Sequence, residues 1–198
     1  MLRLVRVLDI MGIVFEKFPE EILQLVNLRY LAFSCTSTSG LPIGISRLWN
    51  LQTLIITFSL IRSGFLEIIP NVVKFPCKIR KLAISECVVS RIFLTTLCGL
   101  PNLEVLKIEY CVFETYEVGE AEEEEWEITE GDEFRSLQFL SLRYYQLEEI
   151  PCDIGDIPTL QEIFVRECGA SVVGSALNIQ KVQKEEYDNN DLKVLIQD

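Results

Sequence analysis

A six-residue pattern of apolar and polar positions recurs seven times along the chain. Its form is apolar-x-x-apolar-x-apolar, and successive copies start 23, 23, 28, 24, 34 and 23 residues apart. Positions four and six alternate with polar positions, as in a short strand that buries one face. The copies span 5–10, 28–33, 51–56, 79–84, 103–108, 137–142 and 160–165. The pattern therefore predicts seven short strands whose apolar side chains share one interior.

The length of the repeat indicates how these strands are arranged. Units of 20–29 residues with this strand pattern are typical of leucine-rich repeats. One such unit cannot bury its apolar face alone, so units stack into a parallel ladder with a continuous core. The predicted fold is an α/β leucine-rich-repeat solenoid of about seven repeats, a curved parallel strand ladder. We assign residues 1–169 to the repeats and 170–198 to a C-terminal cap or tail.

A second motif, Pro-x-x-Ile, lies between the strands and predicts the convex side. It occurs in 18–25, 41–48 and 150–157, each time with a further apolar residue three positions later. Proline fixes the chain direction, and apolar residues three apart suit a short helix or 3₁₀ turn. We also expect cysteines at the ninth template position, Cys87, Cys111 and Cys168, to be structural thiols beside turn backbone.

Two units are longer than the rest. One contains 61–78, where we expect a longer convex helix or loop. The other contains 114–133, which has eleven acidic residues and no basic one. Such a run predicts a disordered insertion, although Trp126 within it allows docking onto a partner. A further hypothesis is that this run folds onto the basic strand face as an inhibitor. Unchanged partner binding and salt dependence after deletion of 116–131 would contradict it.

The candidate binding surface is the concave face of the ladder, to which template positions two, three, five, seven and eight point. These positions combine aromatic residues with arginine and lysine, the types that dominate binding energy at protein interfaces. The alternative is that each aromatic packs only on neighbours within the ladder. The candidate partner-binding residues are Arg29, Tyr30, Phe58, Arg80, Lys81, Lys107, Tyr110, Phe139, Arg143, Tyr144, Phe164 and Arg166.

Composition argues against catalysis and against nucleic acid as a partner. The chain has no histidine, the residue on which most acid–base catalysis and metal binding depend, so we predict no catalytic residue, no metal site and no enzyme activity. The net charge is −12, although outside 114–133 the chain has 19 acidic and 18 basic residues. Binding to nucleic acid instead requires clustered basic residues.

The same composition bears on where the protein resides. No apolar run is long enough to span a membrane. The seven cysteines form no CxxC pair, and no asparagine begins a glycosylation sequon. These features predict the cytoplasm or the nucleus.

Specific phrases in the sequence resemble a known family. NLRYLAFS (27–34) and NLQTLIIT (50–57), each after a Pro-x-x-Ile-x-x-Leu segment, and the closing GSALNIQKVQKEEYDNNDLKVLI are similar to the C-terminal leucine-rich-repeat region of plant coiled-coil nucleotide-binding disease resistance proteins, of the nightshade late-blight type. The resemblance implies pathogen recognition, autoinhibition and defence. Its implied partners are proteins: the receptor's own nucleotide-binding domain, a pathogen effector or a guarded host protein.

The resemblance implies no cofactor for this chain. The sequence lacks the GxxxxGK[ST] phosphate loop, so ADP or ATP is expected only on an upstream domain. The alternative function is a free-standing intracellular scaffold or adaptor of the same repeat type. A bare first strand, whose LRLVRVL edge has no preceding cap, favours the receptor interpretation.

Overall fold

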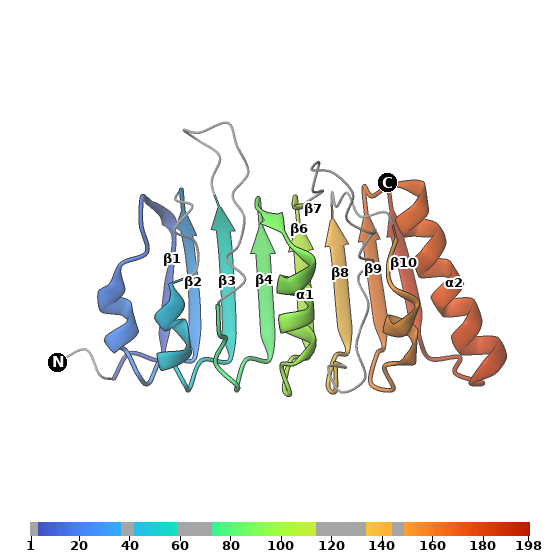
Figure 1. Ribbon diagram of the computed structural model, residues 1–198, viewed down its shortest axis with the longest axis horizontal. Coiled ribbons are helices and arrows are strands. Elements are labelled where there is room, and N and C mark those ends of the chain that lie inside the picture. Colours follow the sequence, from blue (N-terminus) through green and yellow to red (C-terminus); the bar gives the residue numbers. More distant parts are fainter. Residues whose placement is uncertain (1–3, 37–41, 59–72, 114–133, 144–148) are drawn as a thin grey trace, which may run out of the picture.

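The computed structural model describes residues 4–36, 42–58, 73–113, 134–143 and 149–198. Eight parallel strands form one sheet in chain order, and helical segments cover one of its faces (Figure 1). The strands are β1 (Val7–Phe15), β2 (Tyr30–Cys35), β3 (Thr53–Phe58), β4 (Lys81–Ser85), β6 (Val105–Glu109), β8 (Phe139–Arg143), β9 (Glu162–Arg166) and β10 (Lys193–Gln197). A second, two-stranded sheet pairs β5 (Val88–Val89) with β7 (Val112–Phe113).

All seven predicted strands are present, and the fold is the predicted leucine-rich-repeat solenoid. Each template window begins about two residues before its strand, because the first template residue reaches the interior from the preceding turn. The interior lies between the sheet and the helical segments. Five units carry leucine at this first position, and all five leucines are buried there: Leu28, Leu51, Leu103, Leu137 and Leu160. The register is continuous from β2 to β10, so equivalent template positions form columns across the sheet.

The proline motif forms 3₁₀ helices, as predicted. Pro19, Pro42 and Pro151 each precede one directly. The helical segments are η1 (Glu20–Gln24), η2 (Ile43–Arg47), α1 (Arg91–Cys98), η3 (Cys152–Asp156) and α2 (Ala170–Glu186). All lie on the same side of the large sheet (Figure 1). The opposite sheet face carries the outward template positions and is the concave face.

Polar side chains just before the strands join each unit to the one before it. The Asn50 side-chain amide donates to the Val26 carbonyl at 3.1 Å, and that of Asn102 donates to the Cys77 carbonyl at 2.8 Å. The Ser136 hydroxyl makes the equivalent bond in the next unit, to the Pro101 carbonyl at 2.8 Å. These bonds satisfy turn carbonyls that would otherwise lack a partner.

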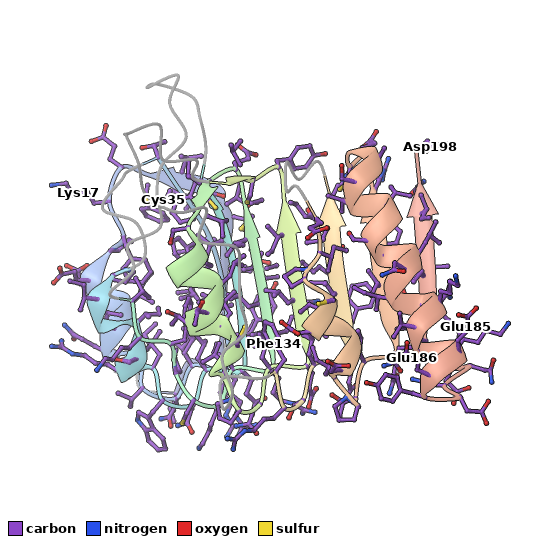
Figure 2. The ribbon with its side chains drawn as sticks, turned by 45° about the vertical axis from the view of Figure 1, so that its right-hand side comes forward. Lys17, Cys35, Phe134, Glu185, Glu186 and Asp198 are labelled. Carbon is purple, nitrogen blue, oxygen red and sulfur yellow. The ribbon has the colours of Figure 1, made fainter. Side chains whose placement is uncertain are left out.

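The C-terminal segment 170–198 contains an eighth strand that the sequence analysis did not predict. The helix α2 covers the last unit, and its Glu185 and Glu186 lie near its C-terminal end (Figure 2). The chain then returns as β10, which pairs with β9 in parallel register. The template misses this strand because Asp191 occupies the first position, where the other units carry leucine, isoleucine or valine. The apolar side chains Leu195 and Ile196 on β10 remain exposed.

The first strand lies at the other edge of the sheet and is exposed, as the sequence predicts. Val7 is 66% exposed, and Ile13 and Val14 are also exposed. Two predictions lie outside the described residues: the disordered insertion and inhibitory docking of 114–133, and most of the longer convex segment 61–78.

Candidate protein interface

The concave face is built from the columns that parallel register creates. The third template position forms a column from β1 to β10 that includes the candidates Tyr30, Lys81 and Phe139. The fifth position includes Lys107 and Phe164, and the seventh includes Arg143 and Arg166. These side chains are half-buried, so their bodies pack on neighbours while part of each is presented to solvent. The face therefore offers aromatic and cationic groups from several strands at once.

Cationic groups lie over aromatic rings at two places on this face. The Arg143 guanidinium is 5.2 Å from the centre of the Tyr110 ring, and the Lys107 ammonium is 5.4 Å from that of Phe139. Such contacts stabilise the charged groups by about 0.5–1 kcal/mol each at exposed sites. They also hold long side chains in place, which lowers the conformational entropy that these side chains lose when a partner binds.

Two arginines sit side by side at the end of the strands. Arg143 and Arg166 are direct register partners on β8 and β9. Like charges in register repel, and the structure supplies compensation for both. Arg143 contacts the Tyr110 ring and is the register partner of Glu109, and the Arg166 Nε atom is 3.5 Å from a Glu167 carboxylate oxygen.

The second-position candidates Arg29 and Arg80 lie near the start of the strands and are exposed. Arg80 is held by Glu104, with a 2.7 Å ion pair on the neighbouring unit. Because the pair is largely exposed, its contribution to stability is small. Its consequence is local: the charge of Arg80 is partly neutralised.

Phe58 was predicted to be exposed on the concave face, and this prediction is wrong. Its side chain is only 4% exposed and belongs to the core. The reason is that β3 remains extended through Phe58, so strand alternation turns this residue inward. Cys35, at the same template position on β2, is buried for the same reason.

Other units turn the eighth position outward by a different backbone conformation. Glu86, Tyr110 and Glu167 have φ values of 60°, 54° and 51°, in the left-handed region. The turn brings the next residue inside, where Cys87 and Cys111 are buried, and leaves Tyr110 40% exposed. Sequence alternation alone does not distinguish these units from β2 and β3; a cysteine at the ninth position accompanies the turn.

The remaining prediction errors on this face concern small residues. Ala32, Ser34 and Ser141 were assigned to it and are buried, and the Ser34 hydroxyl donates to the Met11 carbonyl at 3.2 Å. The candidate Tyr144 lies outside the described residues.

The predicted structural cysteines behave as expected. The thiols of Cys111 and Cys168 donate to the backbone carbonyls of Glu109 and Arg166, each at 3.3 Å. The Cys87 and Cys111 sulfur atoms are 3.3 Å apart, and the hydrogen bond between the two thiols together with burial raises the pKa of the Cys87 thiol well above its ordinary value.

No arrangement for other chemistry was found in the described part of the chain. Within it, no group of three or more histidine, cysteine, aspartate or glutamate side chains is placed to hold a metal ion. No helix among those residues is long and apolar enough to cross a membrane.

The sequence is similar to late blight resistance proteins of Solanum demissum. A putative late blight resistance protein homolog of Solanum demissum is 33% identical over 161 residues, covering 69% of this chain and 12% of that protein. A late blight resistance protein of the same species is 39% identical over 97 residues, 48% of this chain and 7% of that protein. A second putative homolog from this species is 28% identical over 200 residues, 90% of this chain and 14% of that protein.

The chain therefore spans only about an eighth of the length of the first of these relatives. No protein-family model matches the sequence. Among solved structures, the leucine-rich repeat domain of the type III effector XopL aligns with a TM-score of 0.49 at 13% identity, over 96% of this chain and 76% of that domain.

Proposed function

Because the chain is a homologue of the late blight resistance proteins over the aligned part of its length, we propose that it is the protein-binding leucine-rich-repeat module of a plant intracellular immune receptor. In that role it contributes to pathogen recognition, to autoinhibition and to the defence response. The observation that carries the proposal is the identity of a third of the aligned residues to resistance proteins. The expected location is the cytoplasm or the nucleus.

The concave face supports binding of another protein in particular. Arg143, Phe164 and Phe139 lie on adjacent strands and are partly exposed, and arginine and aromatic residues dominate the energy of protein interfaces. The ladder of parallel strands holds these side chains on rigid backbone, which suits a partner with a complementary surface. The partners we propose are a nucleotide-binding domain of the same receptor and a pathogen or host protein. ADP or ATP would bind to that domain and not to this chain.

A binding experiment tests the proposal with the nucleotide-binding domain of a late blight resistance protein as the probe. We expect the 198-residue chain to bind this domain and the double variant Arg143→Glu, Phe164→Ala to lose affinity by at least about tenfold, since two central contacts are removed. The matched control is Lys184→Glu, which changes an exposed charge on α2 outside the concave face. Circular dichroism and thermal melting verify that all three chains fold.

Equal affinity of the double variant and the unaltered chain would contradict a role of the concave face. Loss of binding in the Lys184→Glu variant alone would place the interface on the helical side instead.

A further inference from the structure

A hollow on the concave face lies over β4, between β3 and β6. Its volume is about 290 Å³. The side chains that define its floor and sides come from three consecutive strands, and Met11 of β1 and Glu109 of β6 complete its border. The principal lining residues are Ile55, Thr57, Lys81, Ala83, Ser85 and Lys107.

The hollow lies where a small residue, Ala83, stands between two larger ones in its column, which also carries the small residues Ala32 on β2 and Ser141 on β8. Ala83 lies between Ile55 and Lys107 at the fifth template position of adjacent strands. The same column carries Phe164 on β9 and Leu195 on β10, which are much larger. The floor formed by Ile55 and Ala83 is apolar, so an apolar group placed there would gain free energy by leaving water.

The two hydroxyl groups in the wall of the hollow, those of Thr57 and Ser85, already have hydrogen-bond partners. The hydroxyl oxygens of Thr57 and Ser85 are 2.9 Å apart and share a hydrogen bond. They therefore do not require a polar ligand group, and covering them with an apolar one leaves no hydrogen-bonding group unpaired.

Two lysines, Lys81 and Lys107, line the hollow, and the Lys107 ammonium also lies 5.4 Å from the centre of the Phe139 ring on β8. In the described part of the chain, no carboxylate lies within ion-pair distance of Lys81 or Lys107. Their register neighbours on both sides are uncharged: Thr53 and Val105 for Lys81, Ala83 and Ser141 for Lys107. The acidic border residue, Glu109, has Arg143 as its register partner. The lining of the hollow therefore carries two positive charges and one negative charge, a net charge of +1.

We propose that this hollow receives a segment of the protein partner in which an apolar, leucine-sized side chain lies next to a carboxylate. The apolar side chain rests on Ile55 and Ala83, and the carboxylate pairs with Lys81 and Lys107. This inference rests on the proposed function and identifies the chemistry of the partner at one place on the concave face.

Because the hollow has both an apolar floor and two lysines in its lining, neither an apolar group alone nor an anion alone matches it fully. A purely apolar ligand would partly desolvate two ammonium groups without compensation. A small hydrophilic anion, such as phosphate, would leave the apolar floor in contact with water. A carboxylate next to an apolar side chain satisfies both surfaces.

The probe for the test is N-acetyl-L-leucine, which has an isobutyl side chain beside a free carboxylate. The full chain is titrated with it while methyl and amide signals are followed by NMR. We expect saturable shifts at Ile55, Ala83 and Thr57 with a midpoint in the roughly millimolar range, as suits a ligand of this size. N-acetyl-L-leucinamide, which lacks the charge, and inorganic phosphate, which lacks the side chain, should each bind at least several-fold more weakly.

Variants assign the effect to the hollow. Ala83→Leu fills the floor and should abolish the saturable shifts. Should that variant fail to fold, the double variant Lys81→Gln, Lys107→Gln removes both charges, together with the contact of Lys107 with the Phe139 ring, and should weaken binding several-fold. Lys193→Gln is the matched control, since Lys193 occupies the same column as Lys81 at the far end of the sheet.

Three results would overturn the inference: absence of saturable shifts at Ile55 and Ala83, equal binding of the neutral amide, or phosphate shifts as large as those of N-acetyl-L-leucine. The probe could fail to bind while the variant Arg143→Glu, Phe164→Ala still loses partner binding. That result would contradict only the role of the hollow and leave the proposed interface standing. Failure of both experiments would remove the proposed interface as well.

Discussion

At the scale of single residues, the position of a cysteine in the repeat determines whether its thiol is buried or exposed. Cys87 and Cys111 are fully buried at the ninth template position, whereas Cys77 and Cys152 are exposed. The thiolate is the nucleophile in alkylation. Since the hydrogen bond between the Cys87 and Cys111 thiols and burial raise the pKa of Cys87, its thiol stays neutral at a pH where an exposed thiol has begun to ionise.

We predict that iodoacetamide at a pH of about 8 alkylates Cys77 and Cys152 at least about tenfold faster than Cys87 and Cys111 in the folded chain, because the reagent cannot reach the buried thiols and the raised pKa of Cys87 also disfavours its reactive thiolate. Peptide mass spectrometry over time measures the four rates, and the unfolded chain in denaturant is the control in which they should converge. Fast labelling of Cys87 in the folded chain would contradict its buried position.

The raised pKa also has a consequence for stability. A thiol whose pKa is raised by folding binds its proton more tightly in the folded state. Its contribution to the free energy of unfolding is therefore complete below the unfolded thiol's pKa, about 8.5. That contribution declines as the pH rises above this value toward the raised pKa of Cys87.

The asparagine before a strand is a second single residue with a structural role, because its side chain bonds to the preceding unit. We predict that Asn50→Ala lowers the free energy of unfolding by about 1 kcal/mol, because the Val26 carbonyl loses its donor. Urea denaturation measures the change. Asn190→Ala, at an exposed turn beyond α2, is the control and should change stability by less than about 0.5 kcal/mol. Equal effects of the two substitutions would show that the bond to Val26 contributes nothing.

At the scale of elements, the strands and 3₁₀ helices could be predicted because each rests on a local and repeated signal. The apolar alternation fixes which strand residues face the core, and proline fixes where each 3₁₀ helix begins. The eighth strand could not be found this way, since Asp191 stands where leucine was required. It forms because α2 packs on the last unit: the Gln180 side chain donates to the Leu192 carbonyl at 3.0 Å and holds the chain beside β9.

The left-handed turns limited how much of the candidate site could be predicted. Phe58 and Tyr110 occupy the same template position, yet the first is buried and the second exposed. The difference lies in the sign of one backbone angle after the strand, which no apolar pattern records.

Substitutions at Glu86 test this turn. A β-branched residue at a φ of 60° is strained by about 1–2 kcal/mol, whereas glycine is not. We predict that Glu86→Val lowers the free energy of unfolding by at least about 1 kcal/mol relative to Glu86→Gly. At Lys81, in extended strand, the order should reverse, because valine favours strands and glycine weakens them. The same order at both sites would contradict the left-handed turn.

At the scale of the whole molecule, stacking of the repeat units gives the sheet two faces with different roles. The helical segments lie on one side of the sheet and close the core (Figure 1). The concave side carries charged and aromatic residues in columns that no single unit could assemble. The columns follow from parallel register, so the candidate residues could be grouped from the sequence. The hollow over Ala83 could not, since it depends on the sizes of side chains on three neighbouring strands.

The central claim is that the concave side binds a protein partner, and lysine footprinting tests it most directly. The chain is acetylated alone and in complex with the nucleotide-binding domain of a late blight resistance protein, and labelling is measured at Lys81 and Lys107 on the concave side and at Lys181 and Lys184 on α2. The account predicts that the complex protects Lys81 and Lys107 and leaves Lys181 and Lys184 unchanged. Protection of Lys181 and Lys184, with Lys81 and Lys107 still fully labelled, would contradict it.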